Sequence, residues 1–208
     1  MMNNSTQRAL AVAGVAGIAL AGFTGLGAGD AAAGPNRVVH KKLVDGTPVT
    51  VTLTGERTSV HPAVTNVATS REVFVSGKVG VNVGGAAEGA SIKVGYIVGC
   101  QVNFGASAGT SAGVDSSATT SSSASGGITL GPGQAVYTTV VNTTDSDGDG
   151  IYDFTFTGNR GGVSYGQERF GVDGCAGYAQ AQAKVEVTVS TDSVLGVIVL
   201  YGKPFSIG

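Results

Sequence analysis

The chain has 208 residues, of which 35 are glycine, 12% are charged and 6% are aromatic, and it has no tryptophan. This length fits one domain or a small pair, and 42% apolar residues can build a core, which argues against wholesale disorder. The net charge of −2 excludes an electrostatic nucleic-acid binder, which needs a basic face. Abundant glycine, valine, threonine and serine favour short strands and tight turns. We therefore expect an all-β, exported protein that is not an enzyme.

The first 33 residues have the order of a secretory signal peptide. Met1 to Arg8 is polar with one cation, Ala9 to Ala21 is apolar, and small residues lead up to Ala33. Cleavage after Ala33 follows the small-residue rule for such sites. An uncleaved membrane anchor is the alternative, but the apolar run is shorter than the roughly 18 residues that a membrane helix needs. We expect residues 1–33 to be removed and residues 34–208 to form a single unit.

Alternating apolar and polar residues predict strands through most of the remaining chain. Clear examples with a period of two are Val49 to Leu53, Ser91 to Val98 and Ala183 to Val189. Turn-forming pairs such as Gly84-Gly85 separate these runs. The sequence has no long stripe with helical spacing. Two packed antiparallel sheets, a β-sandwich, are therefore the expected body of the fold.

Cys100 and Cys175 are the only two cysteines in the chain. An oxidising compartment favours joining them. In the chain-entropy model, closing a loop of about 75 residues stabilises the fold by roughly 4.5 kcal/mol. Two buried free thiols are the alternative. We predict one intramolecular disulfide bond.

The segment from Gly95 to Thr144 contains a single charged residue, Asp115, and Gly105 to Gly127 is almost wholly glycine, alanine, serine and threonine. Such a tract is commonly a flexible linker. On both sides of Asp115, however, odd positions are small and polar and even positions mildly apolar, as in a hairpin. At about 3.3 Å per residue, arms of about 13 residues reach roughly 40 Å. That length exceeds a bilayer core of about 30 Å.

A transmembrane hairpin alternates apolar residues facing lipid with polar residues facing a channel. Open sheet edges are excluded from hydrocarbon, and a water-filled channel needs on the order of 16 strands. One hairpin per chain therefore requires a ring of identical subunits, with a stem at residues 100–130. The predicted pore-lining residues are Gln101, Asn103, Ser107 and Ser111.

Asp115 is the predicted pore constriction, because it shares the polar face and lies near the turn. A ring of carboxylates at this point favours cations. The alternative is an ordinary aspartate in a serine-rich turn.

An acidic run follows the predicted stem. Asp145, Asp147 and Asp149 alternate before a glycine, as in the first half of an EF-hand calcium loop, and Asp153 takes the ninth position. The bidentate glutamate of the twelfth position is missing, since Phe156 stands there. An acidic turn between two strands is the alternative. Calcium on these four aspartates is the one cofactor that the sequence suggests, and none is required.

Several short stretches resemble the MspA-type porins of mycolate-containing actinobacteria. They are Leu43-Val44-Asp45-Gly46 with the strand after it, Gly89 to Gly99 with Asn103-Phe104, and Asp192-Ser193-Val194 with Tyr201 to Phe205. The resemblance implies a β-sandwich rim domain, a ring of eight protomers and a sixteen-stranded stem through the outer mycolate membrane. It also implies passage of small hydrophilic solutes.

Three function classes compete. The hairpin pattern and the resemblance favour a homo-oligomeric porin of the outer membrane or cell surface, with a preference for cations. A secreted, monomeric, calcium-stabilised β-sandwich for binding or adhesion also explains the signal peptide, the disulfide and the acidic run, with residues 105–127 as a linker. An enzyme is the least supported class, because Glu88, Glu168 and Asp173 have no placed partner and the sequence contains no nucleophile elbow or zinc spacing.

Overall fold

The computed structural model describes residues 36–64, 67–85, 87–103, 128–129 and 133–208. These residues form thirteen strands and no helix, which confirms the all-β prediction. No helix within these ranges is long and apolar enough to cross a membrane. The predicted signal peptide, residues 1–33, lies outside the described part of the chain.

The first sheet has five strands in the order β1-β2-β3-β10-β5. The pairs β1–β2, β2–β3 and β3–β10 are antiparallel, and the short β5 runs parallel to β10. The predicted strand Val49 to Leu53 lies within β2. The strand bounds are Arg37–Lys42 for β1, Pro48–Pro62 for β2, Arg71–Val83 for β3, Arg160–Asp173 for β10 and Ile128–Thr129 for β5.

The second sheet has the order β12-β11-β4-β6, with β13 paired to β11 and β9 to β4. All of these pairs are antiparallel, and the other two predicted strands lie within β4 and β11. The strand bounds are Leu195–Tyr201 for β12, Cys175–Ser190 for β11, Gly89–Asn103 for β4, Ala135–Thr139 for β6, Phe205–Ser206 for β13 and Phe154–Thr157 for β9.

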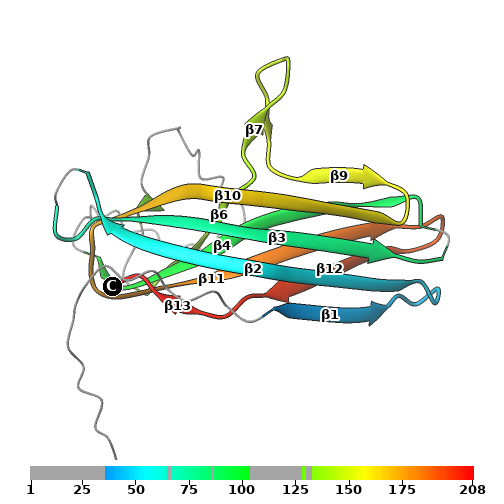
Figure 1. Cartoon of the computed structure of the whole chain (residues 1–208), viewed down its shortest axis with the longest axis horizontal. Helices are drawn as coiled ribbons and strands as arrows, with labels where there is room; N and C mark the ends of the chain where they lie inside the picture. Colours follow the sequence, from blue (N-terminus) through cyan, green and yellow to red (C-terminus); the bar gives the residue numbers. More distant parts are fainter. Residues whose placement is uncertain (1–35, 65–66, 86, 104–127, 130–132) are drawn as a thin grey trace, which may run out of the picture.

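The remaining two strands, β7 (Thr143–Thr144) and β8 (Gly150–Ile151), form a separate hairpin. Figure 1 shows the two sheets stacked in an elongated sandwich, with this hairpin standing away from one long side. We call the β7–β8 hairpin the arm.

The sheets enclose a core of residues that alternate along the strands. Every second side chain points inward, because successive residues of a strand face opposite sides of the sheet. On β11, Val185, Val187 and Val189 are fully buried, whereas Lys184 and Glu186 lie on the outer face. Burying each valine contributes about 1.5–3 kcal/mol. The alternating valines of the sequence therefore account for the packing between the layers.

Two bulges interrupt this alternation on opposite sides of β3. The register between β2 and β3 shifts between Thr54 and Arg57, and that between β10 and β3 shifts between Tyr165 and Glu168. A bulge adds one residue to a strand and re-aims the side chains that follow it. The bulge of β2 turns Glu56 into the core, where only 5% of the residue is exposed.

Candidate functional site

Both ends of the segment 104–127 reach the sandwich at the same place. The last residue of β4, Asn103, pairs with Cys175 at the start of β11, and Ile128 of β5 pairs with Val172 near the end of β10. The strands β10 and β11 are consecutive and are joined through Gly174. The segment therefore departs and returns on either side of one connection, at one end of the sandwich.

The disulfide between Cys100 and Cys175 is present, which confirms the prediction, and its Cα atoms are 5.9 Å apart. Both cysteines are buried. Beside the bond, the register between β4 and β11 shifts between Ala176 and Ala179, and the guanidinium of Arg71 on β3 donates to the Cys175 carbonyl at 3.0 Å. The disulfide and this hydrogen bond fix the point from which the segment 104–127 departs.

An open groove of about 680 Å³ lies beside this departure point on the outer face of the second sheet. Its polar lining is rich in glutamines, including Gln101, Gln180 and Gln182. The amide of Gln180 donates to the Tyr178 hydroxyl at 3.3 Å, and the amide of Gln182 donates to the Gly202 carbonyl at 3.0 Å. The three glutamines present hydrogen-bonding groups to water without a fixed charge.

The predicted pore residues are only partly within the described chain. Gln101 is exposed and lines the groove. The backbone of Asn103 pairs with β11, but its side chain lies outside the described residues. Ser107, Ser111 and Asp115 also lie outside them. Their pore-lining and constriction roles stay predictions.

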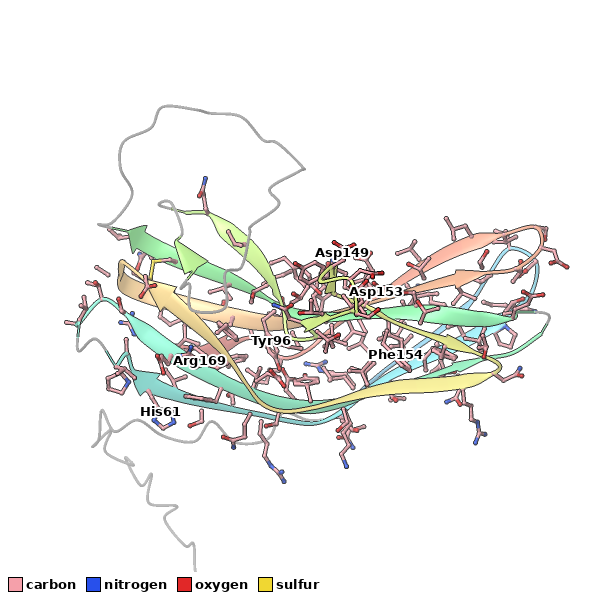
Figure 2. The ribbon with its side chains drawn as sticks, turned by 90° about the horizontal axis from the view of Figure 1, so that it is seen from above. His61, Tyr96, Asp149, Asp153, Phe154 and Arg169 are labelled. Carbon is pink, nitrogen blue, oxygen red and sulfur yellow. A yellow bond between two sulfur atoms is a disulfide. The ribbon has the colours of Figure 1, made fainter. Side chains whose placement is uncertain are left out.

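The acidic run forms the turn of the arm. The Asp145 carboxylate accepts hydrogen bonds from the amides of Asp147 at 3.0 Å and Asp149 at 2.8 Å. Asp153 instead accepts a hydrogen bond from the Ser91 hydroxyl on β4. Figure 2 labels Asp149 and Asp153 beside each other in its view of the molecule.

These contacts match the acidic turn that was the alternative to a calcium site. Among the described residues, no group of three or more histidine, cysteine or acidic side chains is arranged to hold a metal ion. Calcium binding by the four aspartates stays a prediction.

A buried polar cluster that the sequence did not predict lies between the sheets. It consists of Glu56, Tyr96 and Tyr165, and the two tyrosine hydroxyls are 3.1 Å apart. Burial raises the pKa of Glu56, opposed by the nearby positive charge of Arg37. Burial likewise raises the pKa of Tyr96, and that of Tyr165 to about 12. One carboxylate oxygen of Glu56, Oε1, has no hydrogen-bond partner among the described residues.

One signal for this cluster was present in the sequence. The period of two in β2 carries inward side chains at Val49, Val51 and Leu53, and it would place Gly55 inward next. A glycine inside a strand often marks a bulge. Gly55 has a φ of 62°, which glycine adopts readily.

An aromatic ring lies between two lysines on the outer face of the second sheet. The Tyr137 ring of β6 has the Lys93 nitrogen 5.7 Å and the Lys184 nitrogen 5.4 Å from its centre. Lys184 also forms an ion pair with Glu186 at 3.1 Å. Gly95 lies directly beneath, since a Cβ there would be 2.6 Å from the ring. The ring therefore packs over the backbone of β4 at Gly95 on this face.

Comparison with known proteins gives the family. A model of the MspA family matches residues 45–206, which is more than half of the chain. That range includes both cysteines, the segment 104–127, the arm and all strands except β1. No curated protein matches the chain. MspA is a family of porins and not of enzymes. The chain belongs to the MspA family.

Proposed function

We propose that this protein is a homo-oligomeric porin of the outer mycolate membrane that passes small hydrophilic solutes. In this proposal, each copy lends residues 100–130 to a shared transmembrane barrel as a two-stranded hairpin. Membership of the MspA family supports the function, since the porins of that family are oligomeric membrane channels. The ring of eight protomers and the export through a signal peptide belong to the proposal.

One structural observation supports residues 104–127 as the hairpin of the proposed barrel. The chain leaves β4 at Asn103 and returns at Ile128 beside the same β10–β11 connection. A hairpin needs its two ends close together. Arms of about twelve residues each, at about 3.3 Å per residue, reach roughly 40 Å. The disulfide at the departure point gives such a hairpin a fixed base.

The preference for cations is a finer part of the proposal. Asp115 is the single charged residue between Lys93 and Asp145. In a ring of identical subunits it repeats once per copy, and a ring of carboxylates concentrates cations. The uncharged glutamines at the groove add no opposing charge at the base of the segment.

Planar-bilayer recording of the detergent-extracted protein tests the proposal. We expect stepwise, long-lived current increments from the wild type. A variant in which a short glycine-serine turn replaces residues 104–127 is the matched control, because it keeps the described strands and the disulfide. It should retain a cooperative unfolding transition and produce no steps. Current steps from this deletion variant would show that the segment is not the stem.

Silence from a monomeric wild type would contradict the porin and favour a secreted binding module. The Asp115→Asn variant tests cation preference separately. It should assemble normally and shift the reversal potential across a salt gradient towards that of a non-selective pore. An unchanged reversal potential would remove Asp115 from the constriction.

A further inference from the structure

Basic residues gather on β1, and aspartates gather on the arm. β1 forms one edge of the first sheet and carries Arg37, Lys41 and Lys42 without any acidic residue. Between Lys93 and Arg160, by contrast, every charged residue of the chain is an aspartate. In Figure 1, β1 runs along one long side, and the arm and β9 occupy the opposite one.

The basic side also exposes an apolar stripe on an edge strand. The outward residues Leu195, Val197 and Tyr201 of β12 are 70%, 57% and 49% exposed. Their cross-strand partners on β11 are all polar, namely Ser190, Thr188 and Lys184. The stripe is therefore confined to β12 and does not continue across the sheet. β12 contacts β1, whose Val38 is also exposed. We call β1 and β12 together the basic flank.

The opposite side combines apolar residues with the aspartates. Ile151, Tyr152 and Phe154 are each about two-fifths exposed and lie in or beside β8 and β9. The arm places exposed aspartates at its tip, and the contact of Asp153 with Ser91 ties its base to β4. We call the arm and β9 together the acidic flank.

We propose that the basic flank of one copy binds the acidic flank of the next copy. The two flanks have opposite charge, and each offers exposed apolar side chains of the kind that soluble surfaces usually bury in contacts. Because they lie on opposite sides of one chain, the contact is head-to-tail, and its repetition closes into a ring when the rotation permits. This inference rests on the proposed function and names the surfaces that join its subunits.

The geometry leaves the predicted stem free. β4, which ends at Asn103, and β10, which pairs with Ile128 close to its end, both finish at the same end of the long axis of the sandwich, whereas the two flanks lie along its sides (Figure 1). Copies that stand side by side through their flanks therefore point this end in the same direction. Such an arrangement is what a barrel built from one hairpin per copy requires.

Charge reversal on each flank tests the contact. The first variant is Lys41→Glu with Lys42→Glu, and the second is Asp147→Lys with Asp149→Lys; all four side chains are exposed. Asp145 is kept because its carboxylate holds the turn of the arm. The matched control, Arg57→Glu with Lys78→Glu, reverses two exposed charges on the outer faces of β2 and β3.

Assembly is measured by sedimentation velocity in detergent at low and high salt. Each flank variant alone brings like charges together. At low salt we therefore expect the protein concentration at half-assembly to be about tenfold higher, or more, than that of the wild type. High salt should shrink this difference, because it screens exposed charges. The control should assemble like the wild type.

Mixing the two flank variants is the decisive measurement. Each flank of one variant then meets an opposite charge on the other variant, so the equimolar mixture should assemble nearly as well as the wild type, in alternating order. A misfolded variant could not be rescued in this way. Wild-type assembly of either variant alone, or failure of the mixture, would overturn the contact but leave the porin standing. A wild type that stays monomeric would overturn both.

Discussion

The disulfide closes a loop that contains the whole predicted stem, so its removal should have a large and calculable effect. Cys100 and Cys175 are separated by 75 positions. For a loop of this size, the chain-entropy model gives a loss of about 4.5 kcal/mol in the free energy of unfolding when the bond is removed. At about 2–4 °C per kcal/mol for a chain of this length, the melting temperature should fall by about 9–18 °C.

The perturbation is Cys100→Ala combined with Cys175→Ala, measured by guanidinium unfolding in a non-ionic detergent. Both cysteines are buried, so the substitutions also remove some packing. Fully reduced wild type is the control for this loss, because its thiols keep nearly the volume of the disulfide. We expect the reduced protein to lose most of the same free energy. A loss below about 1 kcal/mol in both samples would refute the loop-closure reasoning.

A local effect should accompany the global one. β4 passes the disulfide at Cys100 and continues to Asn103, opposite the irregular register of β11. Without the covalent bond, amide hydrogens of residues 101–103 should exchange faster. The amide hydrogens of Val94 to Val98 should exchange at nearly unchanged rates under native conditions. This stretch of β4 is paired with β11 on one side, and most of it is paired with β6 on the other. Equal acceleration in both stretches would contradict a specific role of the bond at the base of the segment.

Three further predictions concern Glu56, Gly95 and the acidic run. The pKa of Glu56 is raised, so the folded state holds the carboxyl proton more strongly than the unfolded state does. The contribution of this group to stability is therefore complete below the ordinary pKa of 4.5. It is lost as the pH rises through the pKa of the folded state. Urea unfolding over a pH series should show this decline, at most about 1.4 kcal/mol per pH unit from this group, and Glu56→Gln should flatten it. Gly95→Ala should lower the free energy of unfolding by about 1–3 kcal/mol, because the added Cβ would clash with the Thr138 carbonyl oxygen. An unchanged thermal melt would contradict the packing of this face. If the acidic run binds calcium, chelation should lower the melting temperature of the wild type but not of Asp147→Ala, and equal responses would leave an ordinary turn.

The body of the fold was predictable because it depends on local alternation. The runs at Val49 to Leu53, Ser91 to Val98 and Ala183 to Val189 all became strands with one buried face. A half-buried antiparallel sheet needs this period of two, so the sequence pattern and the packing carry the same information. The disulfide followed from the number of cysteines and the expected compartment.

The buried polar cluster could not be predicted from local alternation alone. Glu56, Tyr96 and Tyr165 come from β2, β4 and β10, which meet only when the two sheets are packed. Tyr96 and Tyr165 occupy inward positions that an apolar residue could also fill. What brings Glu56 inward is a bulge, and a bulge changes the parity of a strand by one residue. Counting alternate positions across it gives the wrong face.

The role of the acidic run depends on its place in the fold as well as on its spacing. The spacing of its aspartates allowed two interpretations, a calcium loop and a turn, because both are local structures. A third interpretation needs the position of the run relative to the rest of the chain. β1, which carries Lys41 and Lys42, lies on the opposite side of the sandwich from the arm, so these charges do not meet the aspartates within one copy (Figure 1). Asp145 serves the turn, while the exposed carboxylates of Asp147 and Asp149 make no such contact with the turn amides. Opposite charges that one copy keeps apart can meet between copies, so a contact between subunits joins the turn and the calcium loop as an interpretation of this run.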